Sequence, residues 1–560
     1  MIIGLSYSKY CRRAGVALIG VAISLASLAG TGRKFYEDDP LWQEPETRDA
    51  TGIEERDIDL LFDLPYNLFA RPGASPTRVR AQNVNTVDEV PDSSWFTNRI
   101  LARPLSIEEL LRGPNTLEED RRQMGFVTGL KSVGAAPGFV GRAESGERWF
   151  VTFDAAGHPE AATGALVVAS KLFWALGYWQ VEQYLGMLSP AQVGGGLRIA
   201  QEATVRMPSG QRRPLRPSDF REVLVRAERS SDGSYRMVAA RGIPGEVLGG
   251  FQYHGTRPDD PNDIVPHQHR RELRALKVFG AWTNLVDIKA GNTLDTLITE
   301  NGQARVRHYL QDVGSTFGSA ANGPHDWDEG HEYLFETTPF WKRLVTFGLY
   351  LRPWQTTQYE DYPSIGRFEG EDFDPEAWRP RTPNGAFLNA GDDDTFWAAR
   401  RVMAFTDEML RAVVTVAGFS DAAAERHLAD VLIARRDKIG EVYLPKINPL
   451  VDFALDAGGV LTFKNAAVDA NVASAPAGYQ ASWAAYDNST GESRSLGSDT
   501  LSSGTRMDAP DALSLRAGSF VEVHVSTVDP PRASWTEPVR VYFRRDVDSW
   551  TLVGLERLPD

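Results

Sequence analysis

The chain has 560 residues, of which 42% are hydrophobic and 24% charged. This composition indicates a globular protein long enough for two or more domains, and it excludes a coiled coil, a collagen-like chain and a wholly disordered chain. With 60 basic and 75 acidic residues the net charge is −15, which disfavours non-specific binding to the phosphates of nucleic acids.

The first 29 residues have the pattern of an export signal. Three basic residues precede an apolar run from Ala14 to Ala29, and the small residues Ser27 and Ala29 suit cleavage after Ala29. We therefore expect a signal peptide over 1–29 and a periplasmic or extracellular protein; the alternative is an uncleaved membrane anchor. The single cysteine, Cys11, lies in this segment, so the mature chain would have no disulfide. No later stretch is apolar for long enough to predict a transmembrane span.

Residues 30–123 are predicted to form an extended arm that wraps a core. Charges, prolines and turn residues dominate as far as residue 100. Ser106 and Glu109 have the spacing of a capping box, which predicts that a short helix begins there.

Residues 124–255 are predicted to form a β-rich unit around one helix. Glycines separate short apolar pieces, and a hairpin turn is expected at 144–147. Thr163 is predicted to cap a helix that ends at Leu176, before Gly177. The expected strands are 149–153, 197–207 and 235–240.

Residues 256–445 are predicted to be mainly helical. A helix over 267–285 precedes a hairpin with an Asn-Gly turn at 301–302, which is a strong hairpin signal. Two long amphipathic helices follow, over 394–417 and 420–442. The expected strands of the hairpin are 293–298 and 306–311.

After Pro445 apolar and polar residues alternate, and Ser, Thr, Gly and Asp separate the runs. This pattern predicts a separate β-sandwich over 450–560, of about 110 residues. The expected strands are 460–463, 479–486, 520–526, 539–543 and 550–555.

The residues that carry chemistry lie between these regions. Asp287, Lys289 and Asn292 stand close together, and the hairpin then leads to Asp312-Val-Gly. Phosphoryl transfer uses such a set, because one carboxylate orients the acceptor hydroxyl while an amide oxygen and a second carboxylate hold Mg²⁺. The motif Asp-x-Lys-x-x-Asn alone is a weak signal, and its alternative is a helix-end turn with solvated polar residues.

This layout resembles the catalytic and metal loops of protein-kinase-like folds, in particular those of atypical bacterial kinases such as toxin-type and secreted kinases. The resemblance implies that Asp287 is the catalytic Asp and Lys289 the phosphate-neutralising Lys. It implies that Asn292 and Asp312 are the metal ligands. The chain departs from the usual loop in having Leu-Val instead of His-Arg before the catalytic Asp.

The wider chain also resembles an uncharacterised family of exported bacterial proteins. The two resemblances together imply an α+β fold, in which a bilobal protein-kinase-like domain precedes the β-sandwich of 450–560. The small lobe would span 124–255 and the large lobe 256–445. The pieces that resemble the family are 88–99, 256–263, 267–276 and 308–314.

The residue pair that a kinase-like small lobe contributes to the nucleotide site is missing from this sequence. A kinase-like small lobe carries a Lys on a strand and a Glu on the following helix, and this pair positions the nucleotide phosphates. Here Thr152 and Leu166 stand at the matching positions. Lys131, in the glycine-rich hairpin, and Lys171, on the helix, are speculative nucleotide-binding substitutes. This pattern is typical of a pseudokinase or a strongly altered transferase.

Two further groups of residues have less specific interpretations. Six of the nine histidines lie between His254 and His331, which raises a metallohydrolase as a third and less favoured hypothesis. Arg270, Arg271 and Arg274 share one helix and could bind a phosphate or the acidic loops; the favoured interpretation is a solvated or ion-paired helix face.

The sequence thus predicts an exported protein that binds ATP or another nucleotide with Mg²⁺ or Mn²⁺, with phosphoryl transfer left open. No haem, flavin or nicotinamide site is indicated. The alternative is a non-enzymatic envelope or surface scaffold whose β-sandwich binds a polysaccharide or a protein. Convergence of Asp287, Asn292 and Asp312 would favour the first hypothesis.

Overall fold

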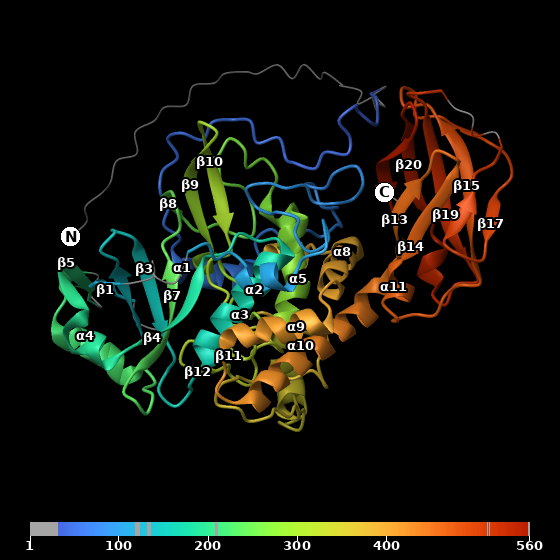
Figure 1. Ribbon diagram of the computed structural model, residues 1–560. Coiled ribbons are helices and arrows are strands. Elements are labelled where there is room, and N and C mark those ends of the chain that lie inside the picture. Colours follow the sequence, from blue (N-terminus) through green and yellow to red (C-terminus); the bar gives the residue numbers. More distant parts are fainter. Residues whose placement is uncertain are drawn as a thin grey trace, which may run out of the picture.

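The computed structural model describes residues 32–117, 124–131, 136–207, 211–511, 513 and 516–557. Figure 1 shows three parts side by side: a small β-rich lobe, a helical lobe and a C-terminal β-region. The predicted signal segment, with Cys11, lies outside the described residues, so export stays a prediction. No helix among the described residues is long and apolar enough to cross a membrane.

The small lobe is built on a seven-stranded sheet in the order β4-β7-β3-β2-β1-β5-β6. The hairpin between β2 and β3 has its predicted turn, since the Ala143 amide donates to the Glu147 carbonyl at 2.9 Å. The helix α4, Pro217–Arg226, was not predicted. The strands are β1 Phe126–Leu130, β2 Gly138–Arg142, β3 Arg148–Phe153, β4 Gln183–Leu188, β5 Arg198–Arg206, β6 Arg212–Pro214 and β7 Tyr235–Arg241.

The helix of the small lobe, α3, spans Ala161–Leu176 and so begins two residues before the predicted cap. Thr163 is not the cap: its amide and hydroxyl both donate to the Asp154 carboxylate at 2.8 Å. Because Asp154 directly follows β3, this contact ties the helix to the sheet. Gly177 ends the helix as predicted, at a φ of 127°.

The arm has little regular structure, as predicted, and it contacts both the main core and the C-terminal region. Trp95 and Phe96 are buried in the main core, and the ring of Phe35 lies 5.1 Å from that of Tyr542 in the C-terminal region. The capping box of Ser106 is confirmed. The helices of this part are α1 Leu60–Pro65, the π-helix η1 Tyr66–Ala70, and α2 Ile107–Arg112.

The large lobe departs from the predicted helices at two points. The first helix starts as a 3₁₀ turn and then breaks, because Arg270 is extended, before α5, Arg271–Thr283. The predicted helix 394–417 is two helices, since the Thr406 side chain caps a new one by accepting from the Met409 amide. The other elements are η4 His267–His269, η5 Ala290–Asn292, α6 Thr337–Val345, η6 Pro353–Gln355, α7 Gly385–Leu388, α8 Asp392–Met403, α9 Asp407–Val414, η7 Thr415–Ala417, α10 Ala422–Tyr443 and η8 Leu444–Lys446.

The predicted hairpin of the large lobe is confirmed as β9, Leu294–Glu300, and β10, Gln303–Tyr309. Asn301 and Gly302 both have positive φ, at 52° and 79°, as this tight turn requires. The strand β8, Glu246–Gly249, adds to β9. A two-stranded piece, β11 Ser319–Ala320 and β12 Gly323–Pro324, follows.

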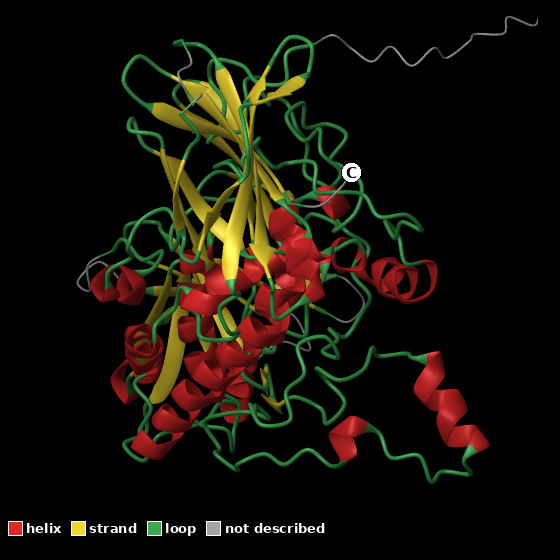
Figure 2. Cartoon of the chain, turned by 90° about the vertical axis from the view of Figure 1, so that its right-hand side faces the viewer, coloured by secondary structure: helices red, strands yellow, loops and turns green. Residues whose placement is uncertain are grey.

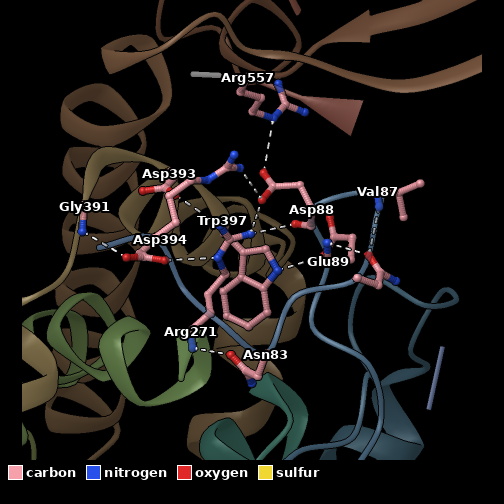
Figure 3. A network of polar contacts seen from close by, with 12 residues as sticks. Asn83, Val87, Asp88, Glu89, Arg271, Gly391, Asp393, Asp394, Trp397 and Arg557 are labelled. Atoms are coloured by element: carbon pink, nitrogen blue, oxygen red, sulfur yellow. Dashed lines mark hydrogen bonds and ion pairs between the residues drawn. The ribbon is translucent and has the colours of Figure 1, made fainter. Parts of the chain in front are cut away.

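The arginines of α5 are ion-paired, as the favoured interpretation had it, but they are buried rather than solvated. Figure 3 shows Arg271 between Asp88 of the arm and two aspartates of α8. Its guanidinium lies 2.8 Å from Asp88, 3.3 Å from Asp393 and 3.1 Å from Asp394. Arg557 approaches the same Asp88 at 3.9 Å. The network therefore joins the arm, the large lobe and the C-terminal region.

The C-terminal region consists of two antiparallel sheets, β13-β14-β18 and β16-β15-β19-β20-β21, with β17 paired to β15. They share one hydrophobic cluster, to which Val87 of the arm also belongs. In Figure 2 this region faces the viewer. The five predicted strands are confirmed. The elements are β13 Leu450–Leu455, β14 Val460–Asn465, α11 Ala466–Asp469, β15 Gly478–Tyr486, β16 Ser493–Ser495, β17 Thr500–Ser502, β18 Arg506–Asp508, β19 Phe520–Val528, η9 Ala533–Thr536, β20 Val539–Arg545 and β21 Trp550–Glu556.

A buried histidine under the arm gives a pH-dependent prediction. His308 stacks on Trp95 with ring centroids 3.5 Å apart, and its Nδ1 lies 2.7 Å from the Asp295 carboxylate. Burial lowers the pKa of His308, but the charges of Asp295, Asp263 and Asp260 outweigh it and raise the pKa above its ordinary value. The stabilisation is therefore fully present below the pKa of an unfolded His, about 6.5, and is lost as the pH rises through the folded-state pKa.

We expect the urea midpoint of the wild type to fall more between about pH 6 and pH 9 than that of His308→Gln. Urea unfolding followed by tryptophan fluorescence measures both. Parallel pH profiles for the two proteins would contradict the role given to His308.

Candidate functional site

The predicted catalytic loop follows α5, and its polar side chains are hydrogen-bonded to one another. The Lys289 amine donates to Asp287 Oδ2 at 2.8 Å. The Asn292 amide nitrogen donates to the same oxygen at 3.1 Å and to the Asp287 carbonyl at 2.7 Å. Both side chains thus hold one carboxylate oxygen of Asp287, and the amide oxygen of Asn292 is turned away from it. The loop is partly exposed, with 26% of the Asp287 side chain accessible to solvent.

The hairpin β9–β10 returns the chain to this loop. At its end the Asp312 amide donates to the Asn292 carbonyl at 3.0 Å. Asp312 is exposed, and its Oδ1 accepts from the Gly314 amide at 2.9 Å. The structure therefore brings Asp287, Asn292 and Asp312 into one chain of contacts, although 25 residues of sequence separate the first from the last.

Lys131 belongs to the small-lobe sheet and lies near enough to Asp312 for the charge of that carboxylate to act on its pKa. It directly follows β1, where the strand register places it opposite Gly138 of β2, and Gly138 is in turn opposite Thr152 of β3. The three residues form one cross-strand row, and side chains in such a row point to the same face. The Lys131 amine makes a hydrogen bond to the Thr152 hydroxyl.

The absence of a side chain at Gly138 allows the Lys131 side chain to extend as far as Thr152. A Cβ at this position would lie 3.0 Å from Lys131 Cδ and 2.1 Å from the Val151 carbonyl oxygen. Any side chain here would therefore collide with the lysine stem and with β3. The amine of Lys131 thus lies beside the position at which the expected strand lysine is missing.

The other two small-lobe residues singled out in the sequence, Leu166 and Lys171, make contacts that do not suit nucleotide binding. Leu166 of α3 faces the metal loop, because its Cδ2 lies 2.8 Å from where a Cβ on Gly314 would stand. The expected glutamate position is thus filled by an apolar contact. Lys171 is buried and donates to the Arg112 carbonyl at the end of α2, at 2.8 Å. This contact favours a structural role for Lys171 over nucleotide binding.

The electrostatics connect the two sides of the site. Burial lowers the pKa of Lys131, and the charge of Asp312 acts in the opposite direction, so the two groups lie within electrostatic reach. Near the predicted catalytic loop, burial raises the pKa of Tyr253, and the charge of Asp287 adds to this effect. Burial lowers the pKa of His325 to about 3, so it is neutral at physiological pH. No motif in the sequence marks Tyr253 or Gly138 as a site residue.

The donor set suits a hard divalent cation. Carboxylate and amide oxygens are the ligands that Mg²⁺ and Mn²⁺ prefer, and Asp287, Asn292 and Asp312 supply them on an accessible surface. Among the described residues, no group of three or more His, Cys, Asp or Glu side chains is placed to hold a metal. The histidines between His254 and His331 are thus not gathered as the metallohydrolase hypothesis requires. His325, for example, contacts the Ser315 hydroxyl at 2.9 Å.

The solved structures that resemble the chain include two crystal structures of the Golgi casein kinase, one with Mn and ADP bound. The first is 11% identical, covers 72% of this chain and 95% of its own, and has a TM-score of 0.29. The second is 10% identical, covers 72% and 96%, and has a TM-score of 0.28. Neither a family model nor a curated protein sequence matches the chain. At these scores the structural similarity is coarse.

Proposed function

We propose that the chain binds a nucleotide together with a divalent metal between the small-lobe sheet and the catalytic loop, with Lys131 as a relocated phosphate-binding lysine. One observation carries the proposal: the Lys131 amine is held on Thr152 and lies within electrostatic reach of Asp312. A pseudokinase that had lost its phosphate contacts would not need a cation there.

Each residue then has a role that follows from its contacts. Lys131, on the small-lobe sheet, would bind the phosphates as a charge-assisted hydrogen-bond donor. Asn292 and Asp312 would hold Mg²⁺ or Mn²⁺, which neutralises phosphate charge when bound. Asp287 would accept a hydrogen bond from an acceptor hydroxyl through Oδ1, since Lys289 and Asn292 occupy Oδ2.

The first test is a thermal-shift titration with ATP and other nucleotides, with and without Mg²⁺ or Mn²⁺. A ligand that binds only the folded state raises the melting temperature, so we expect a rise that requires the metal. Asp312→Ala should remove this rise. Asp312 is exposed, so the variant is expected to fold.

Asp548→Ala serves as the matched control, because Asp548 is an exposed aspartate in the C-terminal region. The control should respond like the wild type. The absence of a rise with any nucleotide and metal would reject the proposal and favour the alternative, a scaffold whose C-terminal sheets bind a polysaccharide or a protein.

A further inference from the structure

The segment 334–352, which contains α6, exposes an unusual amount of apolar surface. Phe347 is 96% exposed and Leu349 is 84% exposed. Every residue from 341 to 349 is exposed, which includes the C-terminal half of the helix. The segment lies at the lower edge of the molecule (Figure 1). Its other exposed large apolar side chains are Leu334, Phe335, Trp341, Leu344, Val345 and Leu351.

This apolar surface continues onto a second segment. The rings of Phe69 in η1 and Phe335 are 5.4 Å apart, so η1 borders the segment 334–352. Leu61 and Phe69 are themselves 90% and 67% exposed. Contiguous exposed apolar patches of this kind mark interaction surfaces in soluble proteins.

The charge of the segment is opposite to that of the whole chain. The segment 334–352 contains three basic residues, Lys342, Arg343 and Arg352, against one acidic residue, Glu336, whereas the net charge of the chain is −15. Arg352 is paired with Glu332 at 2.7 Å. Lys342 lies 5.3 Å from the ring of Tyr350. Lys342 and Arg343 therefore remain as the cations of an aromatic and apolar surface.

We propose that the segment 334–352 docks onto the surface of an anionic lipid bilayer. Exposed Trp, Phe and Leu side chains with Lys and Arg beside them are the chemistry of a helix that lies in the membrane interface. An acidic chain is repelled from an anionic bilayer except where it presents cations, and this segment presents them. The exposed stretch 341–349 combines these cations with large apolar side chains, which complements both the charge and the apolar interior of such a bilayer.

The test is co-sedimentation of the full chain with vesicles of phosphatidylcholine alone and of phosphatidylcholine with phosphatidylglycerol. We expect binding to the anionic vesicles and a loss of roughly tenfold or more in Phe347→Ser/Leu349→Ser, because two large side chains would no longer enter the interface. Lys342→Glu/Arg343→Glu should bind as weakly as the wild type binds neutral vesicles, and added salt should weaken the wild type.

The matched control is Leu501→Ser/Val547→Ser, since these side chains are 71% and 80% exposed in the C-terminal region. The control should bind like the wild type. The segment 1–29 is present in every variant, so it does not account for a difference between them. Unchanged binding of either test variant overturns the proposal. The proposal is also overturned if the wild type does not bind vesicles but forms a dimer that Phe347→Ser/Leu349→Ser abolishes. The surface would then be covered by a second copy of the chain.

Discussion

Replacing Lys131 with methionine is expected to weaken metal-dependent nucleotide binding by about 10- to 100-fold. A hydrogen bond from a charged donor contributes roughly 1.5–3 kcal/mol, which corresponds to that range of affinity. Methionine keeps the unbranched stem that passes over Gly138 and removes only the charged amine. Isothermal titration with ATP and Mg²⁺ measures the loss, and Lys464→Met is the control, since Lys464 is exposed on β14.

The relocation itself can be tested by returning the lysine to β3. In Lys131→Met/Thr152→Lys the amine comes from Thr152, at the other end of the same cross-strand row and in contact with Lys131, so we expect binding to recover most of the lost affinity. Thr152→Lys alone places two cations side by side and should not improve on the wild type. If Lys131→Met binds as tightly as the wild type, Lys131 is not the phosphate ligand, even where Asp312→Ala still abolishes binding.

Replacing Arg271 with methionine is expected to destabilise the protein by about 3–5 kcal/mol. The guanidinium is 0% exposed and holds the carboxylates of Asp88, Asp393 and Asp394, which would remain buried without it. Removing one partner of a buried ion pair leaves uncompensated charge, which costs more than the pair itself contributes. The measurement is the first transition in urea unfolding.

A surface pair gives the comparison. Arg411 and Asp430 are 2.8 Å apart, but their side chains are 52% and 60% exposed. Arg411→Met should therefore change the free energy of unfolding by about 0–1 kcal/mol, because solvent screens such pairs. Similar losses in both variants would show that the network of Figure 3 does not hold the arm as its geometry indicates.

The candidate site was predictable in part because its pieces are close in sequence. Asp287, Lys289 and Asn292 fall on one loop, and the Asn-Gly turn fixes a hairpin that must bring Asp312 back beside it. From the sequence Lys131 is only a speculative substitute, since its position does not match that of the missing lysine. Its contact with Thr152 depends on the register of three strands and on the absence of a side chain at Gly138, and neither is visible in one dimension.

Local patterns determined most of the elements: the strands of the C-terminal region, the capping box at Ser106 and the end of α3 at Gly177 each rest on neighbouring residues. The burial of the charged side chains and the partners that they contact depend on the tertiary structure. Arg270, Arg271 and Arg274, at the start of α5, have the polar pattern of a solvated face, yet Arg271 is buried because acidic residues from the arm and from α8 contact it. Thr163 likewise loses its predicted cap role because Asp154 accepts from it. Hydrogen-bond and charge partners far apart in the sequence can outweigh a local preference, because a buried polar group must be paired wherever its partner comes from.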